Sequence, residues 1–127
     1  MNDGLIFDHH AMRSLGSGNR VLSGLVVQAH RHPLFSIAVP AMCVAEAVRQ
    51  RPGISAHLAQ LPAVDFYSLD RITADACGLM AQSLWPDEGW PVVHAAVLAL
   101  TTGWEIVTTR PEAYKGFGVP VMPVPES

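Results

Sequence analysis

The chain has 127 residues, of which 50% are hydrophobic and 15% are charged, and its formal net charge is −3. This composition excludes a disordered chain, and the length suits one domain with its own hydrophobic core over residues 1–127. The slight excess of acidic residues gives no basic surface of the kind that nucleic-acid-binding proteins usually carry, so any RNA-binding patch must be local.

The two cysteines, Cys43 and Cys77, form no pair motif, which is typical of core thiols in a reduced, cytoplasmic protein. The N-terminus lacks the basic and then apolar stretches of a signal peptide, and no apolar run is long enough to cross a bilayer. We therefore expect a cytoplasmic protein without a membrane segment.

The first half of the chain alternates predicted strands and helices. Residues 5–7 are an apolar run that ends on Asp8, which is typical of a buried strand carrying a carboxylate to the edge of a sheet. Residues 9–15 predict one turn of helix, and the apolar spacing over residues 21–29 predicts an amphipathic helix. Residues 35–39 predict a second strand. Pro40 suits the first position of a helix that carries Glu46 and ends near residue 50.

The second half continues the alternation. Residues 54–61 predict a short helix and residues 64–67 a third strand. Asp70 is a good N-cap for a helix whose expected buried face is Ile72, Ala76, Leu79, Met80 and Leu84. After a loop over residues 85–91, Pro91 begins a helix that Gly103 ends. Residues 104–108 predict a fourth strand, and residues 119–124 a fifth strand whose prolines confine it to an edge.

Strands separated by helices throughout predict an α/β domain with a mainly parallel sheet of about five strands. In such a sheet, residues just beyond the carboxyl ends of the strands collect along one edge. Asp8, Glu46 and Arg110 are placed to meet there, and His94 joins them if the preceding loop folds back. The chain lacks a glycine-rich phosphate loop and a nucleophile elbow, so neither nucleotide binding of those kinds nor that hydrolase chemistry is indicated.

The strand that ends in Asp8, the helix led by Pro40 with Glu46, and the segment from His94 to Thr108 together resemble a PIN domain. The resemblance is closest to the VapC-type toxin ribonucleases of bacterial toxin–antitoxin pairs, and it covers nearly the whole chain in order. It implies a PIN-like three-layer sandwich in which an acidic cluster binds Mg²⁺ or Mn²⁺. It also implies a metal-dependent endoribonuclease that hydrolyses phosphodiester bonds, as a homodimer neutralised by an antitoxin peptide.

The metal cluster that this resemblance implies is altered at about half of its positions. Asp8 and Glu46 match the first two acidic positions of the family. His94 and Arg110 stand where the third and fourth acidic residues are expected. Thr108 matches the small hydroxyl residue of the last motif. His10 replaces the serine or threonine that usually follows the first aspartate.

Two functional hypotheses follow from these replacements. Because arginine is not deprotonated in proteins, Arg110 beside Asp8 and Glu46 would pair with them and compete with Mg²⁺. The nuclease activity would then be reduced or lost, no metal would be needed, and binding of a protein or nucleic-acid partner would remain as the function.

The second hypothesis keeps an active enzyme. Asp8, Glu46 and His94, with His10 as a further candidate, form a mixed oxygen and nitrogen set that suits Mn²⁺, Zn²⁺ or Fe²⁺ better than Mg²⁺. Arg110 and Thr108 would then contact the phosphate of an RNA substrate, while Asp87 or Glu88 would supply a missing acid. A third interpretation makes the cluster purely structural, in a domain that serves for dimerisation.

Each candidate residue also has an ordinary structural interpretation. Asp8 suits the N-cap of the helix that follows it, and Glu46 has Arg49 and Gln50 at helical spacing. His94 is equally compatible with a neutral structural histidine, and Arg110 with a solvated loop charge. His9 and His10 suggest metal binding, although the chain uses histidine often.

Overall fold

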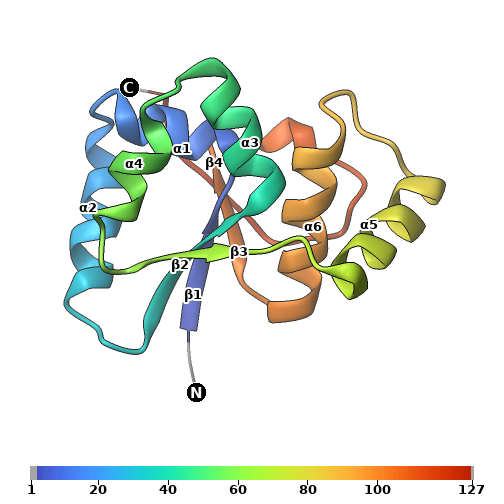
Figure 1. Ribbon diagram of the computed structural model, residues 1–127, viewed down its shortest axis with the longest axis horizontal. Helices are drawn as coiled ribbons and strands as arrows, with labels where there is room; N and C mark the ends of the chain where they lie inside the picture. The colour runs from blue at the N-terminus through green and yellow to red at the C-terminus, as the bar shows by residue number, and fades with distance from the viewer. Residues whose placement is uncertain (1–2, 127) are drawn as a thin grey trace.

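The computed structural model describes residues 3–126 and contains a five-stranded sheet flanked by helices (Figure 1). The strand order is β3-β2-β1-β4-β5, and every pairing is parallel. The strands are β1 (Asp3–Phe7), β2 (Phe35–Pro40), β3 (Val64–Tyr67), β4 (Glu105–Thr108) and β5 (Val121–Pro123). The predicted α/β sandwich with a parallel central sheet is confirmed, and β5 lies at the edge as its prolines require.

The helices lie on the two sides of this sheet (Figure 1). In chain order they are α1 (His9–Gly16), α2 (Arg20–His30), α3 (Ala41–Gln50), α4 (Ile54–Ala59), α5 (Arg71–Ser83) and α6 (Trp90–Thr102), followed by the short 3₁₀ helix η1 (Pro111–Tyr114). Helices α1, α2 and α4 cover one side, and α5 and α6 lie on the other. This arrangement is the three-layer order that alternating strands and helices favour.

The helix ends follow the local sequence chemistry. The side chain of Asp70 accepts the Thr73 N–H at 2.8 Å and so caps α5, as predicted. Gly103 ends α6 in the left-handed conformation with a φ of 77°. Pro40, by contrast, is the last residue of β2 and the N-cap of α3, one position earlier than predicted. Its ring cannot accept a hydrogen bond, so α3 begins without a cap of its own.

The hydrophobic core is centred on the middle strands, where Ile6, Phe7, Ile37 and Ile106 are fully buried. Tight packing extends to the backbone, because a Cβ on Gly4 would lie 2.6 Å from the Ser36 carbonyl oxygen. Residues 3–126 contain no helix long and apolar enough to cross a membrane.

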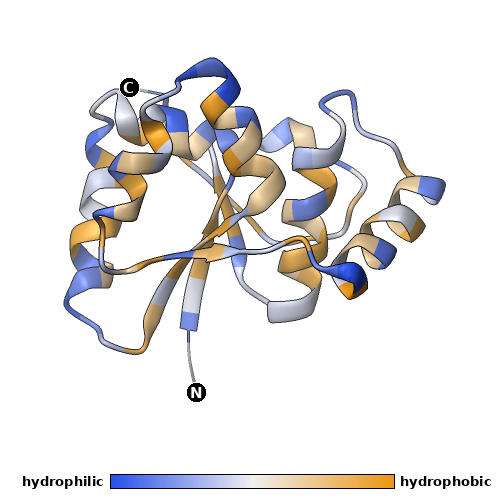
Figure 2. Ribbon diagram, viewed as in Figure 1, coloured by the Kyte–Doolittle hydropathy of each residue, from blue (hydrophilic) through white to orange (hydrophobic). Residues whose placement is uncertain are grey.

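The predicted buried face of α5 is wrong in its outer part. Ile72 and Leu79 are 72% and 68% exposed, whereas Cys77 is buried against Val93 and Val97 of α6. The reason is that α5 packs on α6 and not on the sheet, so only a narrow stripe is covered. Figure 2 shows that α5 lies at the margin of the molecule and carries apolar residues there.

Candidate functional site

Asp8 is fully buried at the junction of β1 and α1, and both of its carboxylate oxygens accept hydrogen bonds from the protein. Oδ1 accepts the Ala11 N–H at 2.8 Å, which makes Asp8 the N-cap of α1. Oδ2 accepts the hydroxyl group of Tyr114 at 2.7 Å. Burial, and then the nearby Asp8 carboxylate, raise the pKa of Tyr114 well above its usual range, so its hydroxyl stays protonated as a donor.

Glu46 lies on α3 and is held by two neighbours one helical turn further along. Its carboxylate accepts hydrogen bonds from Arg49 at 2.5 and 3.1 Å and from Gln50 at 2.5 Å. The hydrogen bond from Arg49 is the largest influence that lowers the pKa of Glu46 to about 2. The pairing that helical spacing predicted for Glu46 is therefore formed.

His94 is 1% exposed on α6 and supplies the cap that Pro40 cannot give. Its Nδ1 accepts the Met42 N–H at 3.2 Å, at the first turn of α3. Burial lowers the pKa of His94, and the charge of Asp70 opposes this shift. A neutral ring whose Nδ1 accepts must carry its proton on Nε2, so His94 behaves as the structural histidine of the alternative interpretation.

Arg110 does not contact the two acidic residues that it was predicted to pair with. Its Nε lies 3.2 Å from Glu126 Oε1, and both side chains are more than half exposed. Within residues 3–126 the predicted salt bridge of Arg110 with Asp8 and Glu46 is absent, so that prediction is wrong. The C-terminal segment after β5 lies beside the end of β4, where the Val124 N–H donates to the Thr108 carbonyl, and it brings the Glu126 carboxylate to Arg110. Thr108 is buried, and its Oγ1 accepts the Arg110 N–H at 3.0 Å.

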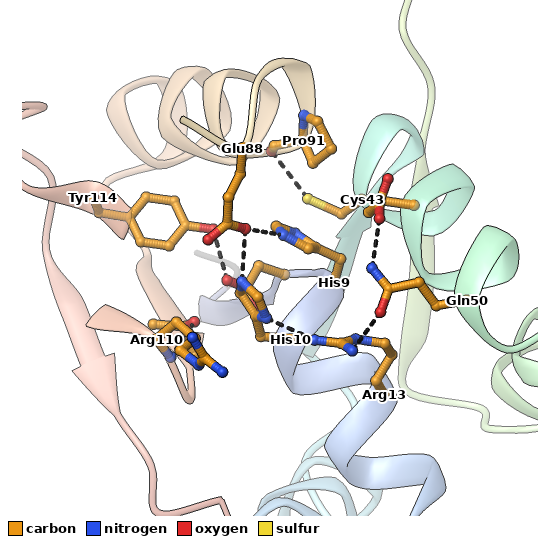
Figure 3. Close-up of polar contacts among 12 residues, drawn as sticks. His9, His10, Arg13, Cys43, Gln50, Glu88, Pro91, Arg110 and Tyr114 are labelled. Atoms are coloured by element: carbon orange, nitrogen blue, oxygen red, sulfur yellow. Dashed lines mark hydrogen bonds and ion pairs between the residues drawn. The ribbon is translucent and has the colours of Figure 1, made fainter. Parts of the chain in front are cut away.

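A different cluster joins α1 to the loop before α6. The Nε2 atoms of His9 and His10 lie 2.6 and 2.7 Å from the same oxygen, Glu88 Oε1 (Figure 3). The histidines are 2% and 8% exposed, and their ring centroids are 4.1 Å apart. Burial, and then the neighbouring His9, lower the pKa of His10. Burial opposes the shift of Glu88, but hydrogen bonds and charges from the two histidines lower its pKa overall.

The histidine cluster continues to α3 through Arg13. The Arg13 guanidinium donates to His10 Nδ1 at 2.9 Å and to the Gln50 side chain. Figure 3 shows this chain of contacts running from Glu88 through His10 and Arg13 to Gln50. A pocket of about 310 Å³ opens over the cluster, lined by His9, His10, Glu46, Arg49, Gln50 and Glu88.

The structure therefore brings together only part of the predicted site. Glu46 shares a pocket with His10 and Glu88, whereas His94 and Arg110 are committed to contacts elsewhere. The sequence offered His10 and Glu88 as secondary members of a metal site. Tyr114 was missed because it lies 106 residues from Asp8 in the sequence. Arg13 was missed although it stands three residues after His10, a spacing that brings side chains together on a helix.

Comparison with known proteins supports the fold. No protein-family model matches the sequence, and no curated protein matches it. A chain of a toxin–antitoxin complex from Klebsiella pneumoniae superposes with a TM-score of 0.66 and 14% sequence identity. The match covers 95% of this chain and 98% of that chain. The present chain thus has an α/β fold that also occurs in a toxin–antitoxin complex.

Proposed function

We propose that this chain is a PIN-like domain of the VapC toxin kind in which metal-dependent ribonuclease activity is lost or strongly reduced. Its remaining function is to bind a protein partner of the antitoxin kind in the cytoplasm. The fold shared with a component of a toxin–antitoxin complex supports the relationship. The loss of activity rests above all on Asp8, whose two oxygens both accept hydrogen bonds from within the chain.

The other candidate ligands support the same proposal. Mg²⁺ prefers several hard oxygen ligands, and it keeps its own water shell unless carboxylates are well placed to replace it. Glu46 is engaged by Arg49 and Gln50, and His94 offers Nδ1 to the Met42 N–H. The donor set therefore does not fit Mg²⁺ or Mn²⁺ in the manner that the PIN resemblance implies. This argument does not need Arg110, which pairs with Glu126.

A cleavage assay tests the loss of activity. Purified protein is incubated with total RNA in millimolar MgCl₂ or MnCl₂, beside an Asp8→Asn variant. We expect both proteins to release fragments at the rate of the buffer alone. Cleavage by the native protein that disappears in Asp8→Asn would overturn the proposal.

The alternative is an active endoribonuclease that uses a divalent metal ion. The observation that favours it is the pocket in which Glu46 lies beside His9, His10 and Glu88, because this set offers both nitrogen and oxygen ligands. In that enzyme His9, His10, Glu46 and Glu88 would hold the ion, since His94 Nδ1 accepts the Met42 N–H and each Asp8 oxygen already accepts one hydrogen bond. Cleavage supported by Mn²⁺, retained in Asp8→Asn and lost in Glu88→Gln, is the result that this alternative requires.

The partner-binding part of the proposal concerns helix α5. Ile72 and Leu79 are the two exposed large apolar side chains on this helix, seven residues apart on one face, and such a pair supports an interaction surface. Another side of the same helix lines an apolar groove of about 220 Å³, together with neighbouring segments: its lining residues are Met42, Leu69, Ala74, Cys77 and Trp90. An apolar peptide segment of an antitoxin-like partner suits such a groove.

Light scattering and pull-down measurements test this surface. Where a small reading frame lies directly upstream of the gene, its protein product is the probe. We expect the double variant Ile72→Arg, Leu79→Arg to lose that binding while remaining folded. If instead the native chain is a dimer and the double variant a monomer, α5 is the interface of a homodimer. Unchanged binding and unchanged mass would exclude α5 from both roles.

A further inference from the structure

We propose that His9, His10 and Glu88 form a binding site for a divalent transition-metal ion of the Zn²⁺ kind. The site differs in residues and chemistry from the acidic Mg²⁺ cluster considered above. It goes beyond the proposed function, which needs no metal.

The first argument is the convergence of the ligand atoms. Two imidazole nitrogens and one carboxylate oxygen lie within 4.8 Å of one another. The two histidines are buried, and Glu88 is exposed. Nitrogen and oxygen ligands of Zn²⁺ stand about 2.0–2.2 Å from the ion. Small rotations of the Glu88 side chain, which extends from an exposed loop, would open the space that an ion needs.

The second argument is the burial of the imidazoles. His9 and His10 are 2% and 8% exposed and in ring contact at the first turn of α1, so the surrounding chain holds both rings beside Glu88. His9 Nδ1 is moreover buried and has no hydrogen-bond partner within residues 3–126, so hydrogen bonding leaves this ring incompletely satisfied.

The third argument concerns which ion fits. Two histidines and one carboxylate are a ligand set that suits Zn²⁺ and its neighbours, whereas Mg²⁺ prefers oxygen alone. The pocket of about 310 Å³ leaves room for a water ligand, and it is also lined by the carboxylate of Glu46. The cluster thus has the composition of a site with an open coordination position.

Arg13 opposes metal binding in the conformation described here. A guanidinium only donates, so its 2.9 Å contact requires His10 Nδ1 to accept and places the proton on Nε2. A metal on Nε2 would move that proton to Nδ1, where it would face the Arg13 guanidinium. Metal binding therefore requires Arg13 to leave His10, and removing Arg13 should strengthen it.

Cobalt titration tests the site directly. Untagged full-length protein is treated with a chelator, dialysed, and titrated with Co²⁺ while visible absorption is recorded, and Zn²⁺ is then added as competitor. We expect saturable binding of one ion, displaced by Zn²⁺. Glu88→Gln should weaken binding about 10- to 100-fold or more, in the range seen when metal sites lose a supporting group. Arg13→Ala should bind more tightly than the native chain.

Two controls make the result decisive. His57→Ala removes an exposed histidine on α4 and should leave the affinity unchanged. Circular dichroism of Glu88→Gln establishes that the fold is kept. Glu88 is chosen for the test because His9 is buried, and a His9 variant would disturb the core.

The proposal is overturned if Co²⁺ and Zn²⁺ show no saturable binding, or if native protein and Glu88→Gln bind with equal affinity. His9, His10 and Glu88 would then be a hydrogen-bonded cluster without a metal ion. The RNA assay is separate, so metal binding without cleavage leaves the proposed function intact.

Discussion

The hydroxyl group of Tyr114 donates a hydrogen bond to Asp8 Oδ2 over 2.7 Å and ties η1 to the junction of β1 and α1. Both groups are buried, so neither can exchange its partner for bulk water. The contact gives a donor to the second oxygen of a carboxylate whose first oxygen caps α1. The residue predicted to lead a metal cluster thus also links η1 to the start of α1.

Removing that hydroxyl should destabilise the fold. Tyr114→Phe leaves Asp8 Oδ2 buried without its donor, and such a loss costs about 1–3 kcal/mol. We expect the free energy of unfolding in urea to fall by this amount, with little change in the far-ultraviolet spectrum. Tyr67→Phe is the matched control, since Tyr67 is half-buried and packs edge-on to Trp104 through its ring. Equal stability of Tyr114→Phe and native protein would contradict the structural role of this contact.

His94 should make stability depend on pH. Its pKa in the folded protein is lowered by burial, so below its ordinary value near 6.5 the unfolded chain binds the proton more readily. The free energy of unfolding therefore falls as the pH drops through about 6.5. His94→Asn keeps a side-chain acceptor for the Met42 N–H but cannot titrate.

Urea unfolding at several pH values between about 7.5 and 5.5 measures this effect. We expect a shallower loss of stability for His94→Asn than for the native chain. His94→Ala should in addition lose about 1 kcal/mol at the upper pH, because α3 then has no cap. Parallel pH curves for the native chain and His94→Asn would contradict the prediction.

Arg49 should control the acidity of Glu46 but hardly affect stability. Arg49→Ala removes the hydrogen bonds that most lower the pKa of Glu46, so this pKa should rise from about 2 towards its ordinary value of 4.5. Because the Arg49 side chain is 69% exposed, the change in unfolding free energy should stay below about 1 kcal/mol. Carboxyl chemical shifts in an NMR titration report the pKa, and a value that stays near 2 would contradict the assignment.

The outer face of α5 should tolerate charge, whereas its inner contact should not. Ile72→Arg changes a side chain that is 72% exposed and should alter the free energy of unfolding by no more than about 0.5 kcal/mol. Val97→Arg buries a charge against Cys77 and should be strongly destabilising. Thermal denaturation compares the two variants, and a large loss in Ile72→Arg would restore the buried face predicted from the sequence.

The sequence predicted the fold well, because the signals that define it are local. The apolar run before Asp8, the cap at Asp70 and the left-handed Gly103 each act within a few residues. The same locality explains the error on α5. Spacing shows that Ile72 and Leu79 share a face with each other, but only packing on α6 decides that this face is outside.

The site was harder to predict because its contacts are distant in sequence and chosen by geometry. Arg110 pairs with Glu126, 16 residues further along the chain, because the segment after β5 lies beside the end of β4. Tyr114 reaches Asp8 from a turn that carries no recognisable motif. The ordinary interpretations of Asp8 as a cap and Glu46 as a helical partner could be predicted, since both follow from spacing alone.

Diffraction from a crystal soaked in MnCl₂, with anomalous differences recorded at the manganese edge, tests the central claim about Asp8 most directly. The account predicts no ion bound to Asp8 and an intact hydrogen bond from Tyr114. An ion on His9, His10 and Glu88 agrees with the separate metal site. A manganese ion bridging Asp8 and Glu46, with Tyr114 displaced, would contradict the account.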